Sequence, residues 1–281
     1  MPMVQIYCNC GKSKYVMKWA YFYNMEQLSV ITICFNNLSD LQSTCSSVDA
    51  QSTKPYEHYI IDGSSNKEIA EWLQNTPQPH YRKWFCERDK GISDAFNKGL
   101  ALCSGSLIHI LNSADIYYSN AVIENVLAFF NNNKAIQWAS GNIFLKRAGI
   151  WVQIGVPFDA QQLYKGMRAV SHPTWFVKKE VYDRVGQFSE VFKIAMDYDL
   201  MCRLKKEAYG YMNETIVKFD DGGVSTKQYL KSLQENVKVY ESHFGFSIAA
   251  RAWQFRLSIL FYLLQSKFGK FLYAIKAANF K

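Results

Sequence analysis

Carboxylates, amides and lysines are concentrated between residues 87 and 99, where the sequence reads Glu-Arg-Asp-Lys-Gly-Ile-Ser-Asp-Ala-Phe-Asn-Lys-Gly. A short apolar run then leads to a second polar group, Asn112-Ser-Ala-Asp115. Oxygen ligands at a strand end bind hard divalent cations, and lysines or a helix N-terminus neutralise phosphate. The two segments together predict a site for a diphosphate and a divalent metal, although Asn-Ser-x-Asp is also a turn-forming sequence.

Four predicted strands would bring polar residues to one edge of a sheet. Leu28–Phe35 is a nearly continuous β-branched run, typical of a strand buried on both faces. Further strands are predicted at 56–61, 81–86 and 107–111, and helices at about 39–51, up to 75, 91–103 and 119–132. This alternation indicates a mostly parallel sheet flanked by helices, in which ligands bind beyond the carboxyl ends of the strands. Asn36, Asp62, Asp89 and Asp115 all follow such ends.

The remaining pattern also predicts an α/β protein. Two or more strands are expected within 135–160, a strand at 171–177, a helix at about 178–186, a helix from Met196 past Lys205, and turn chemistry at 221–225. The chain contains neither GxGxxG nor GxxxxGK[ST], so dinucleotide-binding and P-loop folds lack their signatures.

Charge is distributed unevenly along the 281 residues. The net charge is +8, and residues 227–281 carry nine Lys or Arg against two acids, which leaves +1 for the first 226 residues. Two helices are predicted there, at 227–242 and about 247–278, and they combine basic and aromatic residues. This composition favours an amphipathic helix on an anionic membrane surface, while packing on the catalytic domain or a dimer contact are the alternatives.

The seven cysteines lie mostly in apolar stretches, which indicates reduced thiols in the cytoplasm. No secretory signal is evident, and the apolar run Ile259–Leu264 is far shorter than the ~20 residues of a spanning helix. Residues 1–24 have no regular period, so we interpret 1–27 as an N-terminal extension and Met25 as a possible start of translation.

Three blocks in order resemble family 2 glycosyltransferases, the inverting enzymes with the nucleotide-sugar-binding GT-A fold. They are Val30-Ile-Thr-Ile with Asn36 and Ile60-Ile-Asp62-Gly63-Ser64, then Asp89-Lys-Gly91 with Asp94-Ala95, Asn97-Lys-Gly99 and Leu111-Asn-Ser-Ala-Asp115, then His172, Gly186, Phe188 and Asp197-Tyr-Asp199-Leu200. The resemblance covers about 28–225 and is nearest to enzymes of bacterial capsule, O-antigen and colanic-acid synthesis. It implies a catalytic domain at 28–226, and the basic helical segment predicted from its charge and aromatic content occupies 227–281.

The resemblance also implies roles for individual residues. Asp197 would be the catalytic base, and Asp115 would bind Mg²⁺ or Mn²⁺ at the diphosphate. The nucleotide-binding candidates are Asn36, Asp62, Asp89, Asp94 and Asn112, and the diphosphate or acceptor candidates are Lys98 and His172. Ala114 departs from the family pattern, because many members carry an acid there that meets the ribose.

Each role has a structural alternative. Asp62 can form a turn with its own backbone, and Asp197 can cap a helix. His172 can be a satisfied, half-buried histidine, and Lys98 can be a solvated helix lysine. For Asp199 the structural role is favoured over a catalytic one.

The expected function is therefore transfer of a sugar from a nucleotide-diphosphate sugar, with UDP favoured, to a lipid-linked saccharide in surface polysaccharide synthesis. Such a hexosyltransferase would lie at the inner face of the cell membrane, and we expect no nucleic-acid partner. The alternative is a non-catalytic nucleotide-sugar-binding or scaffold protein. The sequence identifies neither the donor sugar, the acceptor, the linkage nor the oligomeric state.

Overall fold

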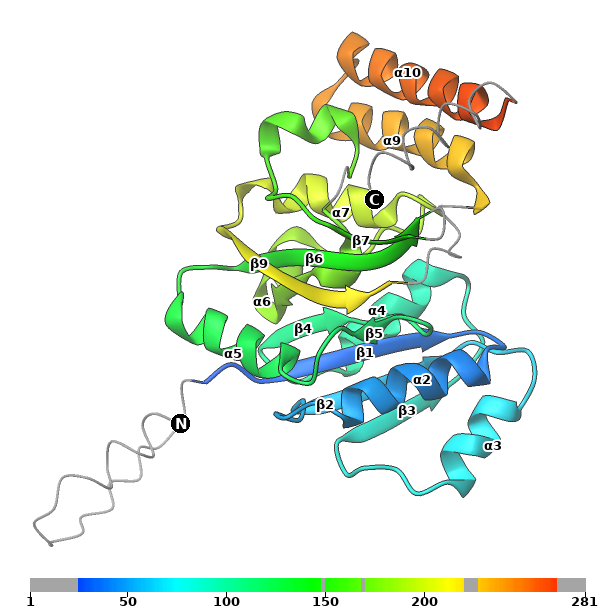
Figure 1. Cartoon of the computed structure of the whole chain (residues 1–281), viewed down its shortest axis with the longest axis vertical. Coiled ribbons are helices and arrows are strands. Elements are labelled where there is room, and N and C mark those ends of the chain that lie inside the picture. The colour runs from blue at the N-terminus through cyan, green and yellow to red at the C-terminus, as the bar shows by residue number, and fades with distance from the viewer. Residues whose placement is uncertain (1–24, 148–149, 168–169, 220–226, 267–281) are drawn as a thin grey trace, which may run out of the picture.

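A computed structural model describes residues 25–147, 150–167, 170–219 and 227–266. Its nine strands are β1 (Leu28–Cys34), β2 (Glu57–Asp62), β3 (Arg82–Cys86), β4 (Leu107–Ile110), β5 (Ile116–Tyr117), β6 (Trp138–Arg147), β7 (Ile150–Ile154), β8 (Phe176–Lys178) and β9 (Tyr209–Lys218). They form one sheet in the order β3-β2-β1-β4-β8-β6-β9-β5, and β7 pairs with β6 (Figure 1).

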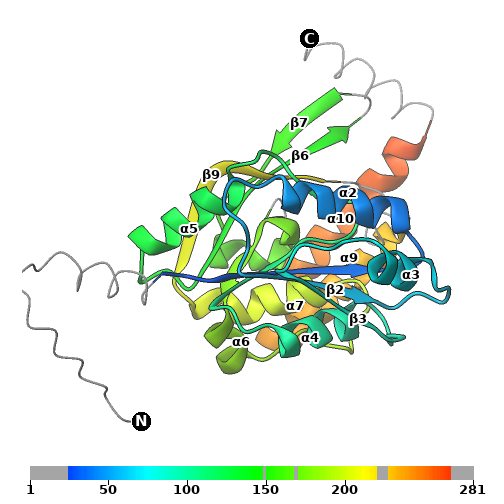
Figure 2. The ribbon, with the colours of Figure 1, turned by 90° about the horizontal axis from the view of Figure 1, so that it is seen from below.

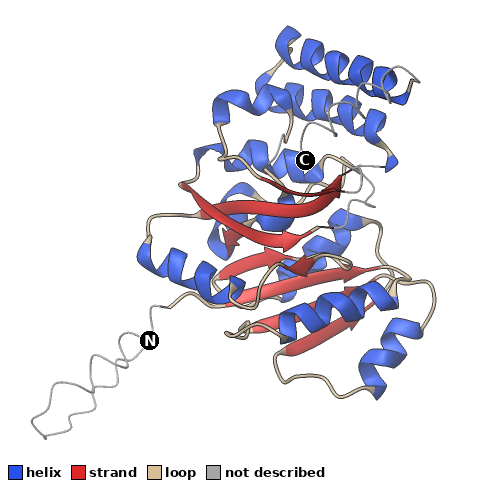
Figure 3. Ribbon diagram, viewed as in Figure 1, coloured by secondary structure: helices blue, strands red, loops and turns tan. Residues whose placement is uncertain are grey.

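Helices cover both faces of this sheet (Figure 3). They are α2 (Leu38–Asp49), α3 (Glu68–Asn75), α4 (Ile92–Leu102), α5 (Val122–Asn132), α6 (Lys179–Val185), α7 (Met196–Arg203), α9 (Tyr229–Phe244) and α10 (Ile248–Gln265). Short 3₁₀ helices are η1 (Ala160–Lys165), η2 (His172–Thr174) and η3 (Leu204–Lys206).

The first half of the sheet is parallel, as the alternating pattern predicted. β3, β2, β1 and β4 are parallel neighbours. β1 is buried on both faces because its alternate residues enter different cores. Val30 packs in the cluster that includes α5, while Ile31 packs in the cluster that includes α4 and α7.

The second half makes the sheet mixed. β8 is antiparallel to β4 and β6, while β6 and β9 are parallel. β4 lies in the middle of the sheet, whereas β5, which begins six residues after β4 ends, pairs antiparallel with β9 at the far end. The sheet therefore curls to bring these strands together. The β6–β7 hairpin extends away from the rest of the sheet (Figure 2).

The sequence analysis did not predict β9, and it extended the helix from Met196 too far. That helix ends at Arg203, and Lys205 lies in η3. The β9 register shifts twice against β6, between Ser140 and Ile143. Such irregularities interrupt the alternation of buried and exposed residues by which a strand is recognised in a sequence.

At the C-terminal end, α9 packs directly against α7 (Figure 1). Val239 of α9 is buried in the same core cluster as Met196 and Leu200 of α7. Residues 1–24 of the predicted extension 1–27, the turn at 221–225 and the end of the last predicted helix, beyond 266, lie outside the described residues. Within the part of the chain that the structure describes, no helix has the length and apolarity needed to cross a membrane.

Candidate active site

The loops after β1 and β2 are joined by Asn36. Its backbone N–H donates to Ser64 Oγ at 2.8 Å, and its side-chain carbonyl accepts from the Ser65 N–H at 3.1 Å. Asn36 has a φ of 51°, a region that asparagine adopts more readily than most residues. Asn36 therefore joins two strand-end loops at the edge of the sheet where ligands bind in parallel sheets.

Asp62 ends β2 and is buried, and its carboxylate accepts from the Ser64 N–H at 3.0 Å. This contact is the turn geometry that the sequence offered as the alternative to nucleotide binding. The next residue, Gly63, faces Asp89: a Cβ at Gly63 would lie 1.8 Å from Asp89 Oδ2. The Asp62 and Asp89 loops are thus in contact, and a Cβ at Gly63 would force the Asp89 carboxylate to move.

Lys98 of α4 binds the first turn of its own helix and the loop that precedes it. Its Nζ lies 3.4 Å from both Asp94 Oδ2 and Glu87 Oε1 and donates to the Arg88 carbonyl at 3.0 Å. Asp94 also accepts from the Lys90 N–H at 2.9 Å, and this hydrogen bond, with the charge of Lys98, lowers the pKa of the Asp94 carboxyl. In this conformation Asp94 and Lys98 stabilise the start of α4.

Thr44 of α2 organises the turn that carries Asp115. The buried Thr44 hydroxyl donates to the Asp115 carbonyl at 2.8 Å and accepts from the Ala114 N–H at 3.1 Å. Ala114 has a φ of 85°, which costs any residue with a Cβ about 1–2 kcal/mol. Ser113 adds a link to the start of α2, because its hydroxyl accepts from Nδ2 of the N-cap residue Asn37 at 2.9 Å.

This turn has oxygen atoms suited to a divalent cation. Asp115 is only 3% exposed, and the buried Asn112 Oδ1 accepts no hydrogen bond from any described residue. The described residues contain no cluster of three or more His, Cys, Asp or Glu that could hold a metal ion. Mg²⁺ is commonly bound by one or two protein carboxylates together with substrate phosphates, so this donor set fits a cation shared with a diphosphate.

His172 lies in an aromatic cluster. Its ring centroid is 5.4 Å from that of Phe96, 5.1 Å from that of Trp175 and 5.5 Å from that of Phe188. Burial lowers the pKa of His172 to about 3, so the ring is neutral at physiological pH. A neutral imidazole can accept a hydrogen bond but adds no positive charge for a diphosphate.

Asp197 lies in the first turn of α7, and its carboxylate accepts from the Tyr198 N–H at 2.8 Å. Burial raises the pKa of Asp197 to about 6. A carboxylate with a pKa near the working pH is suited to accept a proton from a hydroxyl.

Asp199 has a structural role, as the sequence analysis favoured. Its Oδ2 accepts from Arg203 Nη2 at 2.7 Å and Nε at 3.1 Å, and its Oδ1 lies 2.8 Å from His243 Nε2 on α9. Arg203 also donates to the carbonyls of Val185, Gly186 and Gln187. This network, in which Asp199 is buried, fixes α7 to the loop after α6 and to α9.

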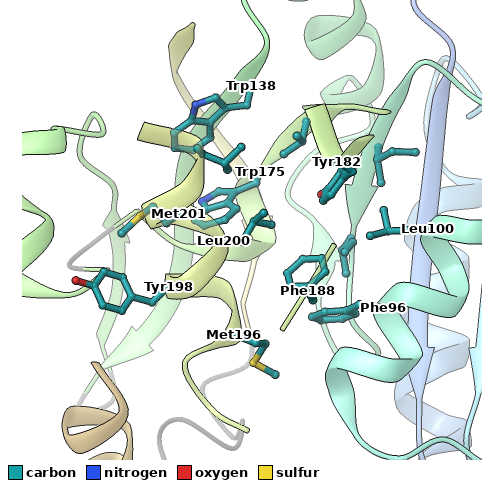
Figure 4. Packing of buried hydrophobic residues seen from close by; sticks show 14 of the residues in the cluster. Phe96, Leu100, Trp138, Trp175, Tyr182, Phe188, Met196, Tyr198, Leu200 and Met201 are labelled. Carbon is teal, nitrogen blue, oxygen red and sulfur yellow. The ribbon is translucent and has the colours of Figure 1, made fainter. Parts of the chain in front are cut away.

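Besides the β4–β8 pairing, the two halves of the sheet are joined where α4 contacts the segment after α6. Asn97 forms two hydrogen bonds of 2.9 Å with the backbone of Phe188, and Ser93 Oγ donates to the Ser189 carbonyl at 2.8 Å. The Phe96 and Phe188 rings lie side by side with centroids 4.8 Å apart (Figure 4). This contact sets the position of the second half against the helix that follows the Asp89 loop.

Several residues with a positioning role were not assigned one from the sequence. Thr44 and His243 lie in helical segments whose residue spacing gives no indication of their hydrogen-bond partners. Asn97 belongs to a block that resembles the family, but the block alone does not reveal its partner, 91 residues away.

A family model described as Glycosyl transferase family 2 matches residues 29–186. An uncharacterized glycosyltransferase of Mycobacterium tuberculosis is 31% identical over 178 residues, which cover 63% of this chain and 68% of that protein. The mannosyltransferase PcManGT from Pyrobaculum calidifontis, solved with GDP-Man and Mn²⁺, has a TM-score of 0.56 at 12% identity and covers 94% of this chain and 86% of that chain.

A second solved structure, S. aureus TarS 1-349 in complex with UDP-GlcNAc, has a TM-score of 0.55 at 13% identity. The match covers 78% of this chain and 67% of that chain. At these identities, the likeness to both solved structures concerns the fold alone.

Proposed function

The chain belongs to glycosyl transferase family 2, and from this premise we propose that it transfers a sugar from a nucleotide-diphosphate sugar to a saccharide hydroxyl with inversion. The predicted GT-A-type fold and the prediction of a transferase enzyme are confirmed. The observation that carries the proposed mechanism is Asp197, a half-buried carboxylate in the first turn of α7 whose pKa is raised to about 6.

In the proposed reaction, the Asp197 carboxylate accepts the proton of the acceptor hydroxyl. The hydroxyl oxygen then forms a bond to the anomeric carbon as the bond from that carbon to the diphosphate oxygen breaks. The nucleoside diphosphate leaves from the opposite face, so the configuration inverts and no glycosyl-enzyme intermediate forms.

The donor nucleotide is proposed to bind at the rim formed by the loops after β1, β2 and β3. Asn36, Asp62 and Asp89 belong to these connected loops, and Asp94 and Lys98 hold the loop that follows β3. UDP is favoured, and the UDP-GlcNAc complex of TarS and the GDP-Man complex of PcManGT support a nucleotide sugar in general.

Asp115 and Asn112 are proposed to hold Mg²⁺ or Mn²⁺ at the diphosphate, and the Mn²⁺ in the PcManGT complex supports this assignment. When bound, such a cation offsets negative charge that builds up on the leaving diphosphate.

The proposed acceptor is a lipid-linked saccharide of surface polysaccharide synthesis, reached at the cytoplasmic face of the membrane. The support is α10, which is capped by Ser247 and exposes Phe255, Ile259, Tyr262 and Leu263. Only Ala250 and Gln254 of this helix are buried, so most of its apolar side chains remain available for a lipid surface.

The test is release of nucleoside diphosphate by purified protein with Mn²⁺, using UDP- and GDP-sugars and a membrane lipid extract. We expect acceptor-dependent release that is lost in Asp115→Ala and Asp197→Asn, while Asp183→Asn, an exposed carboxylate on α6, serves as the matched control. Nucleotide binding with no turnover across the donor and acceptor panel would instead favour the non-catalytic binding protein.

A further inference from the structure

Glu235, on α9, binds the backbone immediately before Asp197. Its Oε2 accepts from the Ile194 N–H at 2.8 Å and the Ala195 N–H at 2.9 Å, and its Oε1 lies 3.4 Å from the Lys193 nitrogen. Ala195 is the N-cap residue of α7, and Asp197 is the second residue of that helix. A side chain 40 residues later in the sequence therefore fixes the entry into the helix that carries the proposed base.

Alanine is a poor N-cap residue, because it has no side-chain oxygen to accept from the free N–H groups at a helix start. The N-cap residue of α7, Ala195, forms no such bond. Within the helix, the Asp197 carboxylate accepts from the N–H of the next residue, Tyr198. The N–H groups of Ile194 and Ala195, at the entry to α7, are bound instead from outside the helix, by the Glu235 carboxylate of α9. Carboxylate to N–H hydrogen bonds are stronger than neutral ones, and a negative charge is favourable at a helix N-terminus.

A second contact fixes α9 along α7. His243, two turns after Glu235, binds Asp199, and Val239 between them is buried against the core that includes Met196. One face of α9 thus binds the entry to α7 through Glu235, the shared core through Val239 and Asp199 of α7 through His243. Figure 1 shows the two helices as neighbours.

From this geometry we infer that Glu235 is a positioning residue for the reaction: it sets the place and direction of the Asp197 carboxylate. The inference rests on the proposed function of Asp197. Misplacement of a catalytic group by about 1 Å can cost about 100-fold in rate, so loss of the Glu235 contacts is expected to lower kcat. The donor site consists of other elements, so the donor KM stays unchanged.

The experiment compares three substitutions in the full-length protein. Glu235→Met has similar length without an acceptor and is expected to lower kcat by about 10- to 100-fold with donor KM and nucleotide affinity unchanged. Glu235→Gln keeps one acceptor oxygen that can receive both N–H groups, so it is expected to restore most of kcat. If Glu235→Met does not fold, Glu235→Asp, which is one methylene shorter, is expected to show the same selective loss of kcat.

Glu241→Met is the matched control. Glu241 lies on the same helix and also accepts a backbone N–H, that of Ser247, but its main partner is Arg251 of α10, at 2.7 Å. An exposed ion pair of this kind contributes little to stability, so kcat is expected to stay within about twofold of wild type.

Unchanged kcat in folded Glu235→Met, or a parallel loss of kcat, nucleotide affinity and thermal stability, would overturn the inference. Activity that persists in Asp197→Asn would instead overturn the proposed function, so the two failures are distinguishable.

Discussion

At the scale of single residues, ionisation of the Asp197 carboxyl is expected to raise catalytic activity and to lower the stability of the fold. Its pKa of about 6 in the folded protein exceeds the value of about 3.9 for an exposed aspartate. Because a base must be ionised, we expect kcat/KM to fall as the pH decreases through about 6. A pH–rate profile without this acidic limb would argue against Asp197 as the base.

The same carboxyl should destabilise the fold when it is charged. Between about pH 4 and 6 the folded state binds the proton that the unfolded state has released, so the free energy of unfolding decreases as pH rises through this range. Asp197→Asn, which cannot ionise, should therefore be more stable than wild type at pH 7.5 by about 1–2 kcal/mol, allowing for partial exposure. Urea denaturation at pH 7.5 and pH 4 measures this gain, which should vanish at the lower pH.

Ala114 gives a prediction from backbone conformation alone. At a φ of 85°, glycine avoids the steric cost of a Cβ, so Ala114→Gly should stabilise the protein by about 1 kcal/mol. Ala101→Gly is the matched control, since this exposed residue lies within α4, where glycine should destabilise by about 1 kcal/mol. Denaturation midpoints that shift in the same direction for both variants would contradict the prediction.

At the scale of elements, the Asp115 turn depends on one hydroxyl of α2. Thr44→Val keeps the shape but leaves the Ala114 N–H and the Asp115 carbonyl without this partner, which should cost about 2–3 kcal/mol. Thr44→Ser keeps the hydroxyl and should cost about 1 kcal/mol. We expect only the valine variant to weaken Mn²⁺-dependent nucleotide binding, measured by calorimetry; equal binding by both variants would show that the turn forms without the hydroxyl.

The elements before the Asp115 turn were predictable because each is specified locally. The β-branched run of β1 and the polar residues after each parallel strand determine both the strands and the rim that they share. β9 was missed because its pairing with β6 depends on irregular register rather than on its own pattern. The family blocks located Asp197, but its raised pKa and its dependence on α9 follow from packing between distant segments, which spacing does not encode.

At the scale of the whole molecule, the C-terminal region combines two environments. α9 is part of the core through Leu233 and Val239, whereas α10 exposes Phe255 (67%) and Leu263 (54%). Bulk charge and aromatic content described the region as one basic amphipathic segment, and they could not distinguish a helix packed on the catalytic domain from one that faces outward.

Membrane docking through α10 is testable with the intact chain. The double variant Phe255→Ser, Leu263→Ser removes exposed apolar side chains, and it should weaken flotation with anionic vesicles by at least about tenfold without changing thermal stability. Tyr56→Ser, an exposed aromatic position (50% exposed) before β2 and away from α10, is the control. Equal flotation of the double variant and wild type would exclude docking through this face, and a change in oligomeric state would assign it to a dimer contact.

The curl of the sheet also bears on how the protein is made. Ile116 follows the Asp115 turn directly but pairs with Lys218, so its partner strand emerges from the ribosome roughly 100 residues later. At a translation rate of 5–20 residues per second, β9 is synthesised about 5–20 seconds after the turn. The parallel strands can assemble in the nascent chain, but the oxygen donors of the proposed cation site acquire their final setting only when most of the polypeptide has been translated.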